Sequence, residues 1–470
     1  MSEEKKRIHP YIPNSVPEIK QAMMDRLGIS NVEELYSYIP DELRFQGKLD
    51  LPEPFLSEIE LKRHMGKILG KNISVREKIS FLGAGCYHHF VPAVCDEINA
   101  RSEFLTAYCG DTYSDHGKVQ AIFEYMSLIG ELVEMDVVGL ATYDGGQAVS
   151  TSLMMSHRVT GRKKLLLPRT MNPDIKNQAL QFCSELEISF VACDPQTGEM
   201  DLADLRSKID EDTCGVFLEN PSYLGFIESR GEEISTIAHE KGALFIVSTD
   251  PSSLGVMEAP ANYGADISCG DIQCLGIHMG FGSGLAGFIA AHDKPEFIMN
   301  FPNHFYGMYQ NEKGEMGFRR SLNQRTSYGS RENAVEYLGT NAGLWAITSA
   351  VYLSLMGPEG MRELGENILA KSQYLIRKLK EEADVRPKFP DAVHFKEIPF
   401  DFSSSGLRIS EINRQLYEKG FFGGKDLSED MPELKDCALY CVTEMTTKEE
   451  IDLLAAALQE ILQKKGRDEQ

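Results

Sequence analysis

An acidic residue, Asp250, follows an apolar stretch near the middle of the chain. The stretch Ala243–Val247 has the length and residue types of a buried β-strand, and two small polar residues separate it from Asp250. In an open parallel sheet, ligands bind beyond the carboxyl ends of the strands. The sequence therefore predicts either a carboxylate that pairs with a bound cation or one that caps the following turn.

The residues after Asp250 determine which reaction such a carboxylate could serve. In the large α/β class of pyridoxal-phosphate (PLP) enzymes, a carboxylate at this position keeps the pyridine nitrogen protonated, and a lysine farther along the chain forms a Schiff base with the cofactor. No lysine occurs between Lys241 and Lys294. Gln273 stands about where that lysine would be, and its amide nitrogen has no free lone pair. We expect that this chain cannot carry out Schiff-base chemistry alone. An enzyme that uses a lysine from elsewhere in the sequence is the less favoured alternative.

A second candidate is the sequence Asp144-Gly145-Gly146, which precedes a segment of small residues and methionines with a helical pattern. Glycines at the start of a helix allow backbone N–H groups to approach a phosphate or another anion. The alternative is an ordinary helix cap by the side chain of Asp144. Both interpretations stay open at the level of the sequence.

A third candidate is the glycine-rich segment Phe81–Phe90, which contains Tyr87, His88 and His89. Successive side chains of an extended segment point to opposite faces, so at most one of the two histidines can face a small site. A histidine there could act as a general acid or base. Packing or surface placement is the alternative for both.

The elements that must position these residues follow from the hydrophobic pattern. Between about residue 76 and residue 310, short apolar runs alternate with amphipathic helical patterns, which is typical of βαβ units and a mostly parallel sheet. The crossovers should be right-handed. The predicted strands are 164–167, 188–192, 215–218 and 243–247, and the predicted helices are 173–184, 201–209 and 231–241.

Other regions flank this predicted sheet. Residues 1–75 read as a helical arm that wraps another surface, because prolines interrupt it repeatedly; Ser57 and Glu60 form a candidate capping box there. Residues 311–345 lack periodicity and are predicted as loop plus a helix start. The later predicted elements are helices 410–419 and 447–465 and strands 392–398 and 438–443. The domains are therefore 1–75 (arm), 76–330 (large α/β domain), 331–380 (connecting helices, broken near Gly357) and 381–470 (small α/β domain).

The composition excludes several classes of function. The net charge is −23, from 71 acidic and 48 basic residues, which disfavours nucleic acid and anionic membranes as partners. The sequence contains no apolar stretch long enough to cross a membrane and no leader pattern at its start, so we expect a cytoplasmic protein. The ten cysteines lack zinc-ligand spacing, so we expect free thiols and no metal.

Together these and other segments resemble subunit 1 of the two-subunit glycine decarboxylase, the P protein of the glycine cleavage system, or a divergent paralogue of it. The resemblance extends over nearly the whole chain in the same order. The segments that carry it are Tyr11–Asn14, Ile39–Phe45, Phe81–Val94, Tyr143–Gly145, Asp250–Gly255, Gly264–Ile267, Ala350–Pro358 and Cys441–Asp452.

The resemblance implies a PLP-transferase-like fold of type I and a partner, subunit 2, that supplies the lysine and holds PLP covalently. Glycine would be decarboxylated, and its aminomethyl group would pass to the lipoyl arm of the H protein. The site residues implied for this chain are Tyr87, His88 and Tyr108 as catalytic residues and Asp144, Gly145, Gly146, Asp250, Gln273, Thr340 and Asn341 as cofactor-binding residues.

Two loops depart from the pattern of the family. Residues 109–117 are one residue shorter and lack two prolines, and residues 335–342 keep only Thr340 and Asn341 of the usual run. A conserved scaffold with altered loops also fits a second function, a catalytically inactive paralogue that binds an amino acid or serves as a regulatory scaffold.

Overall fold

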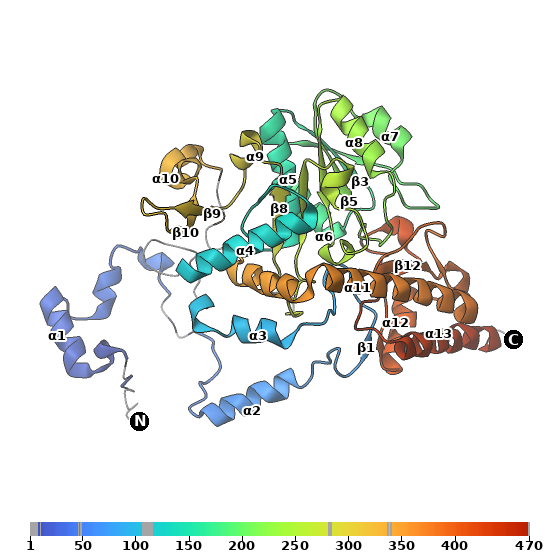
Figure 1. Cartoon of the computed structure of the whole chain (residues 1–470). Coiled ribbons are helices and arrows are strands. Elements are labelled where there is room, and N and C mark those ends of the chain that lie inside the picture. Colours follow the sequence, from blue (N-terminus) through green and yellow to red (C-terminus); the bar gives the residue numbers. More distant parts are fainter. Residues whose placement is uncertain are drawn as a thin grey trace. The chain divides into compact units, whose positions relative to one another are not determined.

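The computed structural model describes residues 8–9, 11–45, 47, 49–105, 116–280, 284–335, 338 and 341–468. The chain divides into two compact units, residues 1–72 and residues 73–470 (Figure 1). The first unit is helical, and the second contains the sheets.

The N-terminal unit consists of helix α1 (Pro17–Leu27), helix α2 (Glu58–Leu69) and short 3-10 turns. Helix α1 has a proline at its first position, where the missing N–H costs nothing, and ends at Gly28 in the left-handed conformation. The predicted capping box is wrong, because Ser57 precedes α2 without a side-chain capping bond. Neither helix buries a residue.

The second unit is built on a seven-stranded sheet with the order β2-β8-β7-β6-β5-β3-β4. Strands β3 to β7 pair in parallel, whereas β8 runs antiparallel to β7, and β2 runs antiparallel to β8. This confirms the predicted α/β class with a mostly parallel sheet. The strands are β2 (Val137–Val138), β3 (Lys164–Pro168), β4 (Glu187–Val191), β5 (Thr213–Glu219), β6 (Leu244–Ser248), β7 (Ile267–Asp271) and β8 (Gly287–Ala291).

Helices cover this sheet, and one of them bears on the candidate site. Helix α5 (Gly145–Thr160) packs against β5, β7 and β8 and against α6, and small residues over most of its length allow this close approach. The other helices of the large domain are α3 (Ala93–Asn99), α4 (His116–Val133), α6 (Pro173–Phe182), α7 (Leu202–Lys208), α8 (Gly231–Glu240), α9 (Pro295–Ile298) and α10 (Ser327–Ser330).

The long helix α11 (Gly343–Ala383) leads from the large domain to the C-terminal part, with a bend at Gly357 (φ 58°, ψ −177°). A four-stranded antiparallel sheet follows, in the order β11-β12-β15-β14, together with helices α12 (Ile409–Glu418) and α13 (Lys448–Asp468). Its strands are β11 (Arg386–Pro387), β12 (Glu397–Asp401), β14 (Lys425–Asp426) and β15 (Cys437–Cys441). The strand predicted at 392–398 is largely misplaced, because regular pairing begins only at Glu397.

Two small strand pairs complete the unit. Strands β9 (Phe305–Gln310) and β10 (Met316–Ser321) form an antiparallel hairpin. No strand was predicted at 305–310, and β10 lies in the segment 311–345 that was predicted as loop plus a helix start. Most of its residues are exposed or only half-buried, so the alternation that reveals a half-buried strand is missing. Strand β1 (Ile79–Ser80) pairs in parallel with β13 (Phe421–Phe422) and thereby joins the segment before residue 81 to the C-terminal part.

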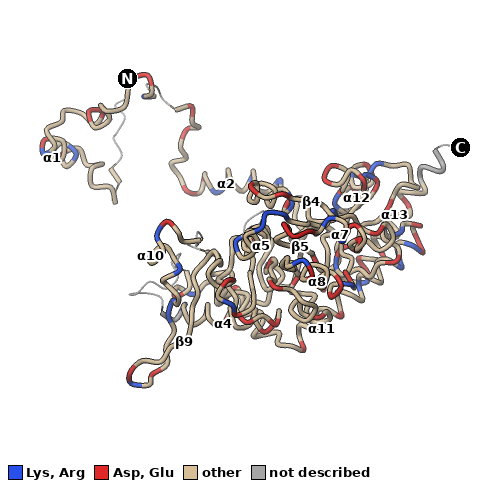
Figure 2. Tube along the Cα trace, turned by 90° about the horizontal axis from the view of Figure 1, so that it is seen from above, with Lys and Arg blue, Asp and Glu red and all other residues tan. Residues whose placement is uncertain are grey.

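Acidic and basic residues are interspersed along the chain (Figure 2). Among the described helices, none is both long and apolar enough to span a membrane. The described residues also include no cluster of three or more side chains suited to hold a metal ion. Nine cysteines outside the undescribed segments are free.

Candidate active site

A cavity of about 360 Å³ lies at the carboxyl ends of β5, β6 and β7. Strand β5 ends at Glu219, β6 leads to Asp250, and β7 ends at Asp271, and all three carboxylates line the cavity. This is the edge at which an open parallel sheet binds its ligands. Residues 84–87 and residues 395–397 line the cavity as well.

Backbone bonds to the C-terminal part hold the glycine-rich segment 81–90 at this cavity. The N–H of Phe81 donates to the carbonyl of Phe422, and the N–H of Cys441 donates to the carbonyl of Phe81, both at 2.9 Å. Gly85 has a φ of 106°, a conformation that favours glycine, where the chain turns toward the cavity. Tyr87 is thereby placed in the cavity wall.

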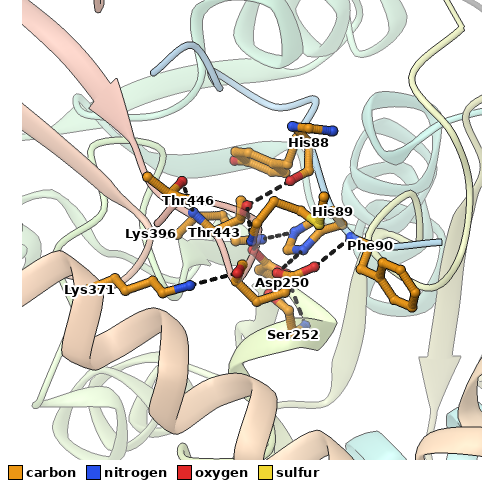
Figure 3. A network of polar contacts seen from close by, with 12 residues as sticks. His88, His89, Phe90, Asp250, Ser252, Lys371, Lys396, Thr443 and Thr446 are labelled. Carbon is orange, nitrogen blue, oxygen red and sulfur yellow. Dashed lines mark hydrogen bonds and ion pairs between the residues drawn. The ribbon is translucent and has the colours of Figure 1, made fainter. Parts of the chain in front are cut away.

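Lys396 enters the cavity from the C-terminal part, although it lies far from Asp250 in sequence. Its ammonium group forms an ion pair with the carboxylate of Asp250 (Figure 3). The ammonium also donates to Nε2 of His89 at 2.9 Å and lies 4.1 Å from the centre of the Tyr87 ring. The Lys396 side chain is 1% exposed, and that of Asp250 is 19% exposed. Lysine is this buried only when its charge is paired.

The backbone at Lys396 is specially held. Its φ is 65°, which is uncommon for a residue with a Cβ and is costly unless the surroundings fix it. Its N–H donates to Oγ of Ser372 on α11 at 3.0 Å, and its carbonyl accepts from the N–H of Val442 at 2.9 Å. These bonds direct the side chain toward Asp250.

The ion pair shifts the titration of both partners. Burial raises the pKa of Asp250, but the charge of Lys396 and the hydrogen bonds from Lys396 and Ser252 outweigh this effect and hold that pKa at about 2. Burial lowers the pKa of Lys396, and the carboxylate of Asp250 more than compensates, so the net shift is upward. Asp250 is therefore ionised and Lys396 is a cation at neutral pH.

His89 continues this network to Glu444. Its Nδ1 lies 2.8 Å from Oε2 of Glu444, whose Oε1 accepts from the N–H of Phe90 at 2.6 Å. An ammonium can only donate, so Nε2 of His89 accepts from Lys396, and Nδ1 carries the proton that is donated to Glu444. Burial and the charge of Lys396 lower the pKa of His89, which agrees with a neutral ring.

Three further carboxyl groups in the cavity have pKa values raised to about 7 or 8. Burial raises the pKa of Glu219 to about 7, that of Asp271 to about 7 and that of Glu397 to about 8. Oε1 of Glu397 accepts from the N–H of Ala84, whereas Oε2 has no hydrogen-bond partner among the described residues.

The start of α5 is occupied by the chain's own carboxylates. Oδ1 of Asp144 accepts from the N–H of Gln147 at 2.6 Å, so the ordinary cap that was one of two interpretations is present. The N–H of Gly145 donates to Oδ2 of Asp271 at 3.0 Å. A Cβ on Gly145 would lie 2.8 Å from Cβ of Asp271, and one on Gly146 would collide with the side chain of Gln178. Close packing alone therefore explains both glycines.

Gln273 is tied to the backbone at every polar atom of its side chain. Its Oε1 accepts from the N–H of Tyr87 at 3.0 Å, and its Nε2 donates to the carbonyls of Tyr87 at 2.9 Å and Ile277 at 2.8 Å. The side chain is a structural link between the end of β7 and the glycine-rich segment.

Two of the remaining predicted residues, His88 and Asn341, are not among the residues that line the cavity. The carbonyl of His88 accepts from the hydroxyl of Thr443 at 2.6 Å, and the ring of His88 lies apart from the ring of His89 in Figure 3. Asn341 has a φ of 56°, and its Nδ2 donates to the carbonyl of Leu338 at 3.2 Å. Tyr108 and Thr340 lie outside the described residues, and the altered loops 109–117 and 335–342 lie partly outside them.

Sequence reasoning missed Lys396, Glu397 and Glu444 and left His89 among the alternatives. Lys396 is 146 residues from Asp250, and no local pattern links the two. The only available signal was a lysine next to a glutamate in a predicted buried strand, 392–398, where charged residues are unusual.

The cavity of this chain does not fit PLP. The carboxylate that would face the pyridine nitrogen already has a cation, Lys396. The N–H group at the start of α5 that would face a phosphate already has an acceptor, the carboxyl group of Asp271. Gln273, which the sequence places about where the Schiff-base lysine would be, is fully bonded through its amide.

Comparisons with a family model and with individual proteins all indicate the same family. The model of the glycine cleavage system P-protein matches residues 9–458. The chain is 36% identical over 467 residues to the probable glycine dehydrogenase (decarboxylating) subunit 1 of Staphylothermus marinus, covering 97% of this chain and 98% of the relative. It is 38% identical over 458 residues to the protein of that name from Pyrococcus furiosus, covering 96% and 99%.

Solved structures agree with this result. A crystal structure of the glycine decarboxylase (P-protein) of the glycine cleavage system in an inhibitor-bound form matches with a TM-score of 0.84 and 30% identity, covering 97% of this chain and 100% of the other. The cysteine desulfurase of Thermococcus onnurineus matches with a TM-score of 0.62 at 16% identity, covering 85% and 98%, which shows the fold alone. The chain therefore belongs to the glycine cleavage system P-protein family.

Proposed function

We propose that the chain is subunit 1 of a two-subunit glycine decarboxylase of the glycine cleavage system. Its partner, subunit 2, bears the Schiff-base lysine and holds PLP covalently. The pair decarboxylates glycine and passes the aminomethyl group to the lipoyl arm of the H protein. The chain alone is catalytically incomplete.

The observation that carries the proposal is the bonding of Gln273. A chain with the fold of PLP enzymes has an amide at the position of the essential amine, and that amide is fixed by three bonds to the backbone. Full-length similarity to proteins named subunit 1 supports a division of labour with a second subunit. No finding favours the alternative of an inactive scaffold.

The contribution of this chain to a shared site stays a proposal. Tyr87 faces the cavity, and His88 and Tyr108 belong to segments on either side of α3. In the proposed complex these side chains orient glycine or admit the lipoyl arm, and they do not bind PLP covalently.

The N-terminal unit gives a second reason to propose a partner. Leu61, Met65 and Ile68 follow one another at three-and-four spacing along α2, and the unit itself leaves all three more than 40% exposed. An apolar helix face of this kind is a surface that a partner covers.

Co-expression with a subunit 2 from the same organism tests the proposal. We expect the two chains to co-purify and, with lipoylated H protein, to catalyse exchange of bicarbonate with the carboxyl carbon of glycine. Each subunit alone should be inactive, and replacement of the Schiff-base lysine of subunit 2 should abolish the exchange. Failure to co-purify, or a complex without exchange activity, would contradict the proposal.

A further inference from the structure

We propose that the ammonium group of Lys396 is a built-in substitute for the protonated pyridine nitrogen of PLP and that its ion pair with Asp250 closes this cavity to the cofactor. The inference concerns the chain by itself. It therefore does not depend on whether the proposed pairing with subunit 2 is correct.

The surroundings of the Lys396 ammonium form a complete cation site. A carboxylate oxygen of Asp250 and Nε2 of His89 accept its protons, and the face of the Tyr87 ring lies 4.1 Å away. In the fold of PLP enzymes, the strand-end carboxylate pairs with a cationic ring nitrogen. Here a cation of the chain itself occupies the position at that carboxylate.

The start of α5, which also lines the cavity, shows a second contact of this kind. Oδ2 of Asp271 accepts from the N–H of Gly145, at the helix end that would bind a phosphate. The chain therefore places a cation of its own at the carboxylate that would face the pyridine nitrogen, and a carboxyl oxygen of its own at the N–H that would face a phosphate. Lys396 and Asp271 each take up one of the contacts that the cofactor would need.

The competing interpretation is that Lys396 is itself the missing Schiff-base lysine. A lysine acts as a nucleophile through its neutral amine, which a desolvated site or a neighbouring cation favours. Lys396 instead lies against a carboxylate, and its backbone conformation and the bond from its N–H to Ser372 hold it there. These contacts stabilise the charged form, which is not nucleophilic.

The first test compares three variants of the full chain by thermal unfolding. Lys396→Met leaves the buried carboxylate of Asp250 without a cation, with only its hydrogen bonds from Ser252, and should lower Tm by about 5 °C. Lys396→Met combined with Asp250→Asn removes both charges and should recover at least half of that loss. The matched control is Lys371→Met, because Lys371 lies in the same network but donates to the backbone carbonyl of Glu444 rather than to a carboxylate (Figure 3).

The pH dependence sharpens this test. Without Lys396, burial is the main influence on Asp250 and raises its pKa above the unfolded value. The stabilising protonated form is then lost as the pH rises, so the deficit of Lys396→Met should be small near pH 4 and grow toward pH 7. Besides Lys396 and His89, six titratable groups face Asp250, and burial raises the pKa of each. The wild type and Lys396→Met both keep these groups. They are Tyr87, Asp271, Cys274, Tyr352, Glu397 and Cys441.

The second test uses PLP directly. The wild-type chain is incubated with PLP, reduced with borohydride and mapped by peptide mass spectrometry. Lys396 should carry no pyridoxyl group, PLP should not raise Tm, and modification of exposed lysines should be equal in the wild type and in Lys396→Met.

Three outcomes would overturn the proposal. These are a pyridoxyl group on Lys396, stabilisation of the wild-type chain by PLP, and a loss of Tm in Lys396→Met no larger than that in Lys371→Met. If Lys396→Met alone does not fold, the doubly substituted chain decides, because a folded double variant supports the ion pair and an unfolded one contradicts it.

Discussion

The cavity of the second unit and the apolar face of α2 in the N-terminal unit differ in whether their side chains have partners. In the cavity, the charged groups of Lys396, Asp250 and Asp271 have partners within the same chain. On α2, a row of apolar side chains has no cover within its own unit. The difference teaches that the chain satisfies the charged groups of its cavity by itself, whereas it leaves the apolar side chains of α2 exposed.

The largest expected effect comes from placing charges on the apolar face of α2, which tests whether a partner covers that face. Leu61→Asp together with Met65→Asp places charges on the apolar face of α2, and a partner that covers this face would have to bury them. Co-purification with subunit 2 should be lost, while the Tm of the isolated chain stays within about 1 °C, because the unit does not bury these side chains. The control is Lys62→Asp on the same helix, and equal loss of binding in that variant would contradict the assignment of the face.

A smaller effect would test whether His89 completes the hydrogen-bond network of the cavity. His89→Ala removes a buried ring and deprives both Lys396 and Glu444 of a bonding partner, so we expect a loss of about 3 kcal/mol in the free energy of unfolding. His88→Ala serves as the matched control and should cost less than about 1 kcal/mol. Denaturant unfolding of the isolated chains measures both values, and similar losses would show that the network is not closed through His89.

The smallest effect concerns the pH dependence of one cavity carboxyl. The pKa of Glu397 is raised by burial to about 8, so its stabilising protonated form is present below its unfolded pKa and is lost as the pH rises through 8. Glu397→Gln should therefore gain about 1.4 kcal/mol relative to the wild type between pH 7 and pH 9. Its amide oxygen can still accept from the N–H of Ala84. Parallel pH profiles of the two chains would contradict the raised pKa.

Much of the fold follows from local patterns. The strands β3 to β6 and the helices between them were predicted within a few residues, because each buried strand is a short apolar run that ends at polar residues. The hairpin β9–β10 was missed because most of its side chains are not buried. The position of Gln273 at the cavity was also predictable, since it follows from the order of strands.

The central contact of the site was not predictable in this way. The ion pair of Lys396 with Asp250 depends on how the C-terminal part meets the edge of the large sheet, and residues separated by 146 positions carry no shared period. The same reason applies to Asp271, which the sequence analysis did not single out. Its place at the start of α5 arises from the close packing of Gly145 against it.

The bend of α11 at Gly357 has a consequence for this contact. The part before the bend packs on α3 and α4, and the part after it carries Ser372, which holds the backbone of Lys396. Gly357 has open space around it but a φ of 58°, so its backbone conformation rather than a collision determines what can stand there. We therefore expect a substitution that changes the bend to move Ser372, and with it the backbone that directs Lys396 toward Asp250.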